Sequence, residues 1–216
     1  MSRTRLTLAD ILPGFVAAHL FIPLFIVRSL GPLDFWWWMS LNTAALIIYS
    51  LTSDREYRRL LTRDLSGGLL RKLLLGVLSA CALYGVFMAG NALSRLILPF
   101  AGEGIRQVYG FKQGASLTRM ALLMTFLIGP GEELFWRGFL QRRWQRRFGD
   151  IPGYLMAALL YALVHLGTGN VMLVLAAATC GLFWGWLYLR FRSVIILVVS
   201  HVLWDLAIFL FAPLAG

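Results

Sequence analysis

Charged residues are scarce in this sequence, and their scarcity excludes an ordinary soluble domain. Only 14% of the 216 residues are charged, whereas 59% are hydrophobic and the mean hydropathy is +0.74. A soluble domain carries about 25% charged residues. A membrane span needs about 20 mostly apolar residues, and this chain has room for several. The composition therefore predicts an all-α, polytopic transmembrane helical bundle that forms a single integral membrane domain over residues 1–216.

Cysteine is almost absent, and internal repeats, low-complexity tracts and flexible linkers are lacking. The two cysteines, Cys81 and Cys180, fall in separate apolar segments, where thiols are more often small apolar fillers than a disulfide or a metal pair. No serine lies in a Gly-x-Ser-x-Gly setting, which argues against a serine hydrolase. Asp205 is the only aspartate deep in an apolar segment, so a mechanism with two facing aspartates is also disfavoured.

The net charge of +10 does not form a single basic patch, because the 20 lysines and arginines are distributed between the apolar segments. This pattern argues against nucleic-acid binding and is typical of a membrane protein with basic loops on its inner side. With the N-terminus in the cytoplasm, most basic residues lie on that side, beginning with Arg3 and Arg5. The sequence therefore predicts a cytoplasmic N-terminus and about seven spans (six to eight), at roughly 11–30, 33–52, 72–99, 117–141, 151–166, 170–189 and 193–213.

Two stretches next to these spans have unusual composition. The run Trp36-Trp37-Trp38 predicts an aromatic anchor at the outer edge of the second span rather than a ligand site. The stretch from Ala101 to Ala115 contains four glycines, which predicts an irregular outer connection rather than a lid. We expect neither stretch to take part in chemistry.

The fourth span carries the strongest functional signal, Glu132-Glu133-x-x-x-Arg137, directly after Gly129-Pro130-Gly131. Pro with flanking Gly predicts a kink or break in the helix, which would make room for water. Glu133 and Arg137 are four residues apart and can pair on one helix face. Glu132 lies about 100° round the helix from Glu133 and is left to face another group. The alternative is that both carboxylates pair with arginine at the inner membrane edge.

Two further motifs follow on later spans, Tyr161-x-x-x-His165 and His201-x-x-x-Asp205. The same four-residue spacing places each pair on one helix face, with Tyr161 one turn from the His165 imidazole. Ionisable groups at membrane depth are costly and usually serve a function. We therefore expect an active site assembled between membrane helices. Proton relays in transporters use similar side chains, so a non-proteolytic transporter or peptide-binding scaffold is the alternative.

The three motifs, in this order on successive membrane helices, resemble those of the CPBP family. This family contains CAAX prenyl endoproteases and bacteriocin-processing or immunity-associated membrane proteins, and it is also called the ABI family. The resemblance covers a catalytic core of about residues 117–213. Tyr161 stands where the family commonly has Phe, and Asp205 stands where Asn or Asp is found.

The resemblance implies intramembrane proteolysis of the glutamic type. Glu132 would act as the general base and activate a water molecule together with His165. His201 and Asp205 would stabilise the tetrahedral oxyanion or position the scissile carbonyl. An ionised Asp205 would repel an oxyanion, so it must either be protonated or orient His201.

Three supporting residues and a metal alternative complete the expectation. Glu133 and Arg137 would hold the helix in register, with Tyr161 beside them, although Arg137 could instead contact a substrate carboxylate. If a catalytic zinc were bound, Glu132, His165 and His201 would be its ligands. The resemblance favours a mechanism with no cofactor. No carboxylate partner for either histidine is evident from the sequence.

The resemblance gives a class of partner but no single substrate. Family members act on prenylated CAAX tails, bacteriocin precursors or C-terminal sorting tags. A compact, Arg-rich chain favours a protein of the bacterial inner (cytoplasmic) membrane that acts on a membrane-anchored protein or peptide tail. The sequence gives no oligomeric state.

Overall fold

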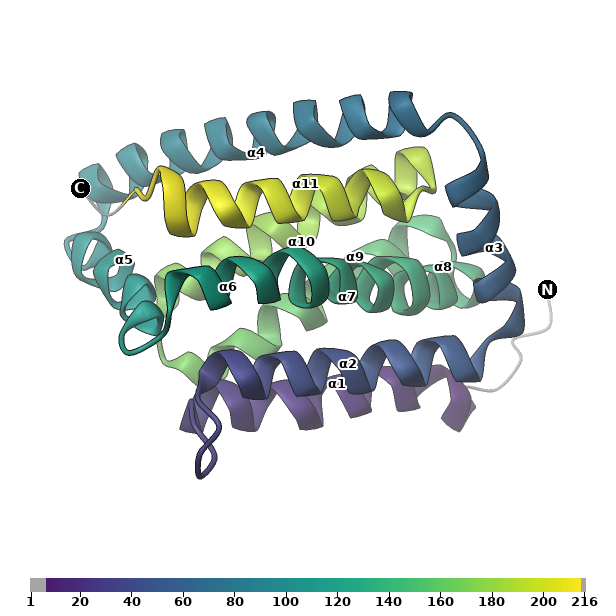
Figure 1. Ribbon diagram of the computed structural model, residues 1–216, viewed down its shortest axis with the longest axis horizontal. Coiled ribbons are helices and arrows are strands. Elements are labelled where there is room, and N and C mark those ends of the chain that lie inside the picture. The colour runs from purple at the N-terminus through teal and green to yellow at the C-terminus, as the bar shows by residue number, and fades with distance from the viewer. Residues whose placement is uncertain (1–6, 215–216) are drawn as a thin grey trace.

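The protein is described here by a computed structural model of residues 7–214, and the described chain is all-helical (Figure 1). Each of the seven predicted segments is helical. The α-helices are α1 (Leu8–Val27), α2 (Phe35–Ser53), α3 (Arg55–Ser66), α4 (Leu69–Ile97), α5 (Ala101–Tyr109), α6 (Leu117–Leu123), α7 (Gly129–Glu132), α8 (Arg142–Phe148), α9 (Asp150–Val164), α10 (Val171–Phe191) and α11 (Val194–Leu206). Short 3₁₀ and π segments lie between them: η1 (Gly110–Lys112), η2 (Met124–Ile128), η3 (Glu133–Gln141), η4 (His165–Thr168) and η5 (Ala207–Phe211).

Five helices of the described chain are long and apolar enough to cross a membrane. They are Leu8–Val27, Leu69–Ile97, Asp150–Thr168, Val171–Phe191 and Val194–Phe211. Large apolar side chains project from their outer faces, including Phe15 and Leu96, which are 65% and 81% exposed. Such a surface suits lipid rather than water. The count of seven spans stays a prediction, as does the cytoplasmic N-terminus; Arg3 and Arg5 lie outside the described residues.

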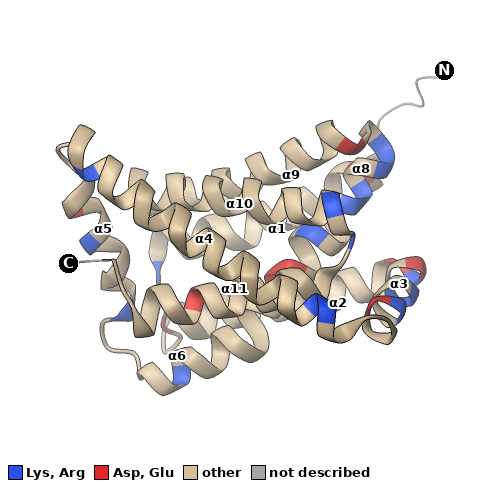
Figure 2. Cartoon of the chain, turned by 90° about the horizontal axis from the view of Figure 1, so that it is seen from above, with Lys and Arg blue, Asp and Glu red and all other residues tan. Residues whose placement is uncertain are grey.

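The long helices run side by side and place basic residues mainly at one end of the bundle. In Figure 1, α4 lies over α11, the helix formed by α6 and α7 crosses the middle, and α1 and α2 form the opposite side. Lys and Arg gather on α3, α8 and the neighbouring helix ends, whereas α5 and the C-terminus lie at the other end (Figure 2). The predicted division of basic residues between loops is therefore also a division in space.

The predicted break at Gly129-Pro130-Gly131 is wrong, because the helix from 117 to 148 continues through it. Met124–Ile128 forms a π-helical turn just before the proline, in which the Gly129 N–H donates to the Met124 carbonyl five residues earlier. Pro130 has no N–H to donate, and a wider turn accommodates this without ending the helix. A second π segment, Glu133–Gln141, follows directly.

The glycines of this motif allow close packing rather than a break. A Cβ on Gly129 would lie 3.0 Å from the Val202 side chain of α11. A Cβ on Gly131 would lie 2.8 Å from Ile47 Cδ1 of α2, and closer still to Thr43 Cγ2. The two glycines thus let α11 and α2 approach the helix that carries Glu132.

The stretch 101–115 is also more ordered than predicted, because Ala101–Tyr109 forms α5. Gly104 packs against Met172 at the start of α10, where a Cβ would lie 2.7 Å from Met172 Cγ. The Gly104 carbonyl accepts a hydrogen bond from Asn170 Nδ2 at 2.8 Å. Gly104 therefore allows α5 to pack against the start of α10.

The tryptophan run divides between the surface and the interior. Trp37 is 43% exposed, which suits the predicted anchor, but Trp36 is buried at 5% exposure. The Trp36 indole N–H donates to the Phe111 carbonyl at 2.9 Å. The interpretation of the run as a surface anchor is therefore wrong for Trp36.

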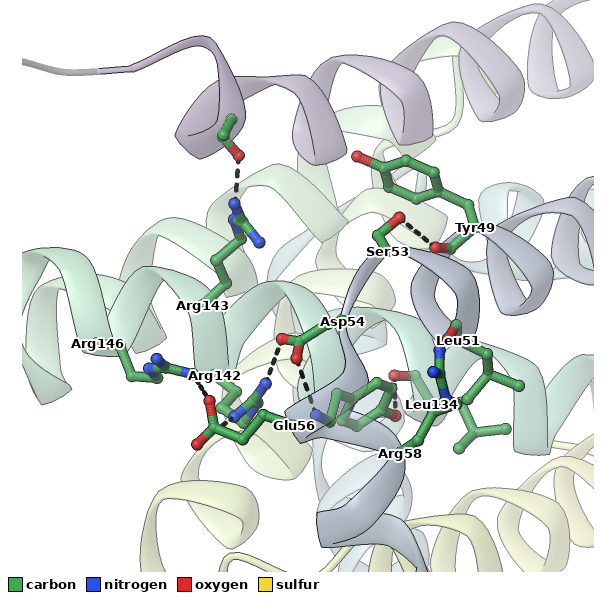
Figure 3. A network of polar contacts seen from close by, with 12 residues as sticks. Tyr49, Leu51, Ser53, Asp54, Glu56, Arg58, Leu134, Arg142, Arg143 and Arg146 are labelled. Atoms are coloured by element: carbon green, nitrogen blue, oxygen red, sulfur yellow. Dashed lines mark hydrogen bonds and ion pairs between the residues drawn. The ribbon is translucent and has the colours of Figure 1, made fainter.

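The helix that carries Glu132 is also fixed by α3, as Figure 3 shows. Asp54 caps α3 by accepting from the Tyr57 N–H, and it forms an ion pair with Arg142 at 2.5 Å. The Tyr57 hydroxyl donates to the Leu134 carbonyl at 2.6 Å, and its ring packs over Gly138. Burial raises the pKa of Tyr57 well above its ordinary value, so this hydroxyl keeps its proton.

We expect Gly131→Ala to destabilise the protein, because the added methyl group would overlap Ile47 and Thr43, which are held in a packed helix contact. Overpacking of this kind costs about 1–3 kcal/mol. Gly85→Ala is the matched control, since Gly85 also lies within a helix but has nothing within 4 Å of its added Cβ. Thermal unfolding in detergent should give a lower Tm for Gly131→Ala alone. Equal Tm values for the two variants would contradict the packing role.

Candidate active site

The four predicted catalytic side chains line one cavity of about 530 Å³. Glu132 enters it from the central helix, His165 from the end of α9, and His201 and Asp205 from α11. Tyr161 lines it as well. Most of the remaining lining is apolar and comes from α4, α5 and α10. Of the predicted site residues, Glu133 and Arg137 lie outside the lining.

The two adjacent carboxylates have different surroundings, as their helical spacing predicts. Glu132 faces the cavity, and its Oε2 accepts a hydrogen bond of 2.7 Å from the Tyr161 hydroxyl. Glu133 has no exposed surface. Arg137 Nη1 donates to Glu133 Oε1 at 2.8 Å, so the pair predicted from the four-residue spacing is present. Glu132 is thus the carboxylate that a bound molecule can reach.

Glu133 also contacts a histidine, a partnership that sequence analysis missed. His201 Nδ1 lies 2.7 Å from Glu133 Oε1, the same oxygen that accepts from Arg137. Arg137 Nη2 continues the network to the Cys180 carbonyl of α10, at 3.4 Å. The expectation that no carboxylate supports either histidine is therefore wrong for His201. The contact joins two motifs far apart in sequence, so no local spacing could reveal it.

His165 is oriented by backbone contacts at the end of α9. Its Nδ1 lies 2.7 Å from the Tyr161 carbonyl oxygen, and a carbonyl can only accept a hydrogen bond. The proton of a neutral His165 is therefore on Nδ1, which leaves the lone pair on Nε2. Phe25 covers the imidazole, with ring centroids 4.4 Å apart. His165 thus offers a hydrogen-bond acceptor to the cavity.

His201 is held between two carboxylates and an indole. Its Nδ1 faces Glu133, while its Nε2 lies 3.5 Å from Asp205 Oδ2. Trp184 stacks on the imidazole at a centroid distance of 3.9 Å. The Trp184 indole N–H in turn donates to Ser200 Oγ at 3.1 Å. Nothing in the sequence marked Trp184, because it belongs to no charged motif and its contacts come from another helix.

The two cysteines and the remaining histidine, His19, lie apart from this cluster or add only apolar surface. Cys180 is buried in the cavity wall and Cys81 is exposed on α4, and both are free thiols. His19 stacks on Phe15 of its own helix. Within residues 7–214, no three His, Cys, Asp or Glu side chains are placed close enough to hold a metal ion together. The mechanism without a cofactor, and its zinc alternative with Glu132, His165 and His201 as ligands, both stay predictions.

We expect Glu133→Gln to destabilise the protein far more than Glu132→Gln. Removing one member of a buried ion pair costs about 3–5 kcal/mol, and Glu133→Gln would leave Arg137 without its carboxylate. Gln at 132 can still accept from Tyr161, so that variant is the control. Thermal unfolding of the three proteins measures the difference. A wild-type Tm for Glu133→Gln would contradict the structural role of the pair.

The comparisons with known proteins agree with the motif geometry. Residues 114–207 match the family model described as type II CAAX prenyl endopeptidase, Rce1-like. No curated protein and no solved structure matches the chain. The matched segment contains every motif residue and the three helices that carry the cluster. Residues 114–207 are thus similar to the type II CAAX prenyl endopeptidases, and this match, together with the apolar helices, supports an integral membrane hydrolase of the CAAX protease family.

Proposed function

We propose that this protein is an intramembrane endopeptidase in which Glu132 activates the attacking water without a metal ion. One observation carries the proposal: Glu132 and His165 both face the cavity that His201 and Asp205 enter from another helix. A carboxylate beside an oriented imidazole lone pair can hold and deprotonate a water molecule. Buried hydrogen-bonding groups on the opposite wall can bind the carbonyl of a peptide.

In the first step, water lies between Glu132 and His165. Glu132 takes a proton from it while His165 Nε2 accepts a hydrogen bond from the remaining O–H. The oxygen then attacks the scissile carbonyl carbon, and the carbonyl becomes an oxyanion. The Tyr161 hydroxyl donates to Glu132 Oε2, so one lone pair of that oxygen is occupied and the carboxylate is held in a fixed orientation.

The oxyanion is stabilised by His201, which requires a proton on His201 Nε2. In the proposed mechanism the imidazole carries both protons: Glu133 accepts from Nδ1, and Nε2, which lies 3.5 Å from Asp205, donates to the oxyanion. Asp205 then serves to orient His201 and to stabilise its positive charge. Collapse of the intermediate breaks the C–N bond, and Glu132 returns its proton to the leaving amine. One water is consumed for each bond cut.

The apolar part of the cavity indicates a membrane-anchored substrate. Away from the carboxylates, the cavity runs between α4, α5 and α10 and is lined by Phe87, Val108, Leu173 and Ala176. Such a lining accepts a prenyl chain or an apolar peptide side chain with little cost of desolvation. We propose that the substrate is a membrane-anchored protein or peptide whose apolar tail occupies this region.

The proposed topology has seven spans, an N-terminus in the cytoplasm and a bacterial inner membrane as its location. The basic residues at the α3 and α8 end support this orientation through the positive-inside rule (Figure 2). The remaining two spans would be α2 and the helix of residues 117–148. Under this topology the end of the bundle that contains α5 faces away from the cytoplasm.

We expect Glu132→Gln to abolish cleavage, while Tyr161→Phe retains measurable activity, reduced by roughly 10- to 150-fold. Loss of a general base typically costs about 100-fold or more. Loss of one hydrogen bond to a carboxylate costs about 1.5–3 kcal/mol at most, and Phe at this position keeps the ring. Cleavage of a tagged single-span protein co-expressed with each variant measures this. Wild-type activity in Glu132→Gln would contradict the mechanism and favour a transporter or scaffold.

We expect purified enzyme to keep its activity after dialysis against a strong zinc chelator such as 1,10-phenanthroline. This expectation follows from the proposed metal-free mechanism, and among residues 7–214 no three His, Cys, Asp or Glu side chains form a group that could hold a metal ion. Activity is compared with and without chelator, and a non-chelating phenanthroline isomer serves as the control. Loss of activity that added zinc restores would contradict the metal-independent mechanism.

A further inference from the structure

A second cavity, of about 780 Å³, lies next to the catalytic one at the α5 end of the bundle. Unlike the catalytic cavity, it is lined largely by polar and charged side chains, including Arg28, Asp34, Glu103 and Arg106. We call this second cavity the vestibule. Phe35, Trp36 and Phe111 line both cavities, so these three aromatic residues form the wall between them.

The aromatic wall connects the vestibule to the catalytic histidine. The rings of Phe35 and Phe111 are 4.7 Å apart, and those of Phe25 and Phe35 are 5.9 Å apart. Phe25 in turn lies over His165, at 4.4 Å. A peptide segment that extends from the catalytic cavity into the vestibule must therefore pass these rings. Three extended residues cover about 10 Å, the length of two such ring-to-ring steps.

The charges of the vestibule leave one cation without an acidic partner. Arg106 pairs with Glu103, and Asp34 pairs with Arg119. Among the described residues, no carboxylate lies within ion-pair distance of Arg28. The Arg28 guanidinium lies 5.0 Å over the Phe111 ring, and its Nη2 donates to the Thr168 carbonyl at 3.1 Å. The Arg28 guanidinium therefore lies at the aromatic wall and has further N–H groups that can donate hydrogen bonds.

The backbone at Arg28 gives no reason for an arginine. Arg28 ends α1 in a left-handed conformation, with φ of 67°. Glycine is the residue that this conformation favours, because any side chain there meets steric resistance. The turn would thus form more readily without the side chain. The hydrogen bond to Thr168 and the contact with Phe111 offset part of this cost, and a bound anion would add to them.

We propose that the vestibule binds the C-terminal carboxylate of the substrate and that Arg28 is its partner. The inference rests on the proposed function and adds a specificity-determining residue to it. The apolar anchor would lie between α4 and α10, the scissile bond at Glu132, and the segment beyond it would pass the aromatic wall. A guanidinium binds a carboxylate with two parallel hydrogen bonds, which suits a terminal group of the peptide. The enzyme would then favour bonds close to a free C-terminus.

The test uses the purified full chain in detergent and two peptides that differ only at the C-terminus. Each carries a prenylated cysteine followed by three residues, and the last one bears either a free carboxylate or a carboxamide. We expect the wild type to prefer the acid by at least about tenfold in kcat/KM, mainly through KM. Arg28→Gly should remove this preference by lowering cleavage of the acid to the level of the amide. Gly suits the turn, so the fold should be kept.

Arg106→Gln is the matched control, because Arg106 lines the same vestibule but already has Glu103 as its partner. This variant should keep the preference for the acid. Equal cleavage of acid and amide by the wild type, or an unchanged preference in Arg28→Gly, would overturn the role of Arg28 and leave the proposed protease intact. Cleavage of both peptides that survives Glu132→Gln would instead overturn the proposed function, and the inference with it. Binding of the two peptides to Glu132→Gln gives the same comparison without turnover.

Discussion

The buried carboxylate of Glu133 is the interaction on which the rest of the site depends. One oxygen receives Arg137 from its own helix and His201 from α11, and Arg137 extends to the Cys180 carbonyl of α10. A lone carboxylate or guanidinium at this depth would be too costly to keep ionised. Each charged group can therefore be buried only when its partners are in place. The network consequently fixes three helices relative to one another.

This network gives the two neighbouring carboxylates different surroundings. Because Glu133 is the partner of Arg137 and His201, Glu132 can face the cavity with a tyrosine hydroxyl as its hydrogen-bond partner. The separation needs the backbone of the central helix to lie close to α2 and α11. Gly129 and Gly131 provide that approach, and the π turn lets the helix continue through Pro130. Sequence features that predict a break thus serve helix packing.

Local spacing predicted the parts of this arrangement that a single helix determines. The seven helical segments, the Glu133–Arg137 pair and the cavity-facing side of Glu132 all follow from hydropathy and the helical repeat. The contacts between helices did not follow, because packing decides them: Glu133 with His201, and Trp184 on the imidazole. The helix at 101–109 was missed for a related reason. Its glycines look irregular in sequence, but Gly104 gives Met172 a place to pack.

The two cavities differ in polarity, and this difference favours one orientation of a bound peptide. The cavity that Glu132 lines is apolar toward α4 and α10, and the vestibule beyond Phe35 and Phe111 is polar. A peptide with a lipid-like anchor at one end and a charged carboxylate at the other matches this difference in only one orientation, because the reverse would bury the charge among apolar side chains. In that orientation, the distance from the C-terminus of the peptide determines which peptide bond lies at Glu132. The enzyme would then select the bond to cut by its position in the peptide rather than by the side chains around it, because the cavity wall offers few polar groups to distinguish one residue from another.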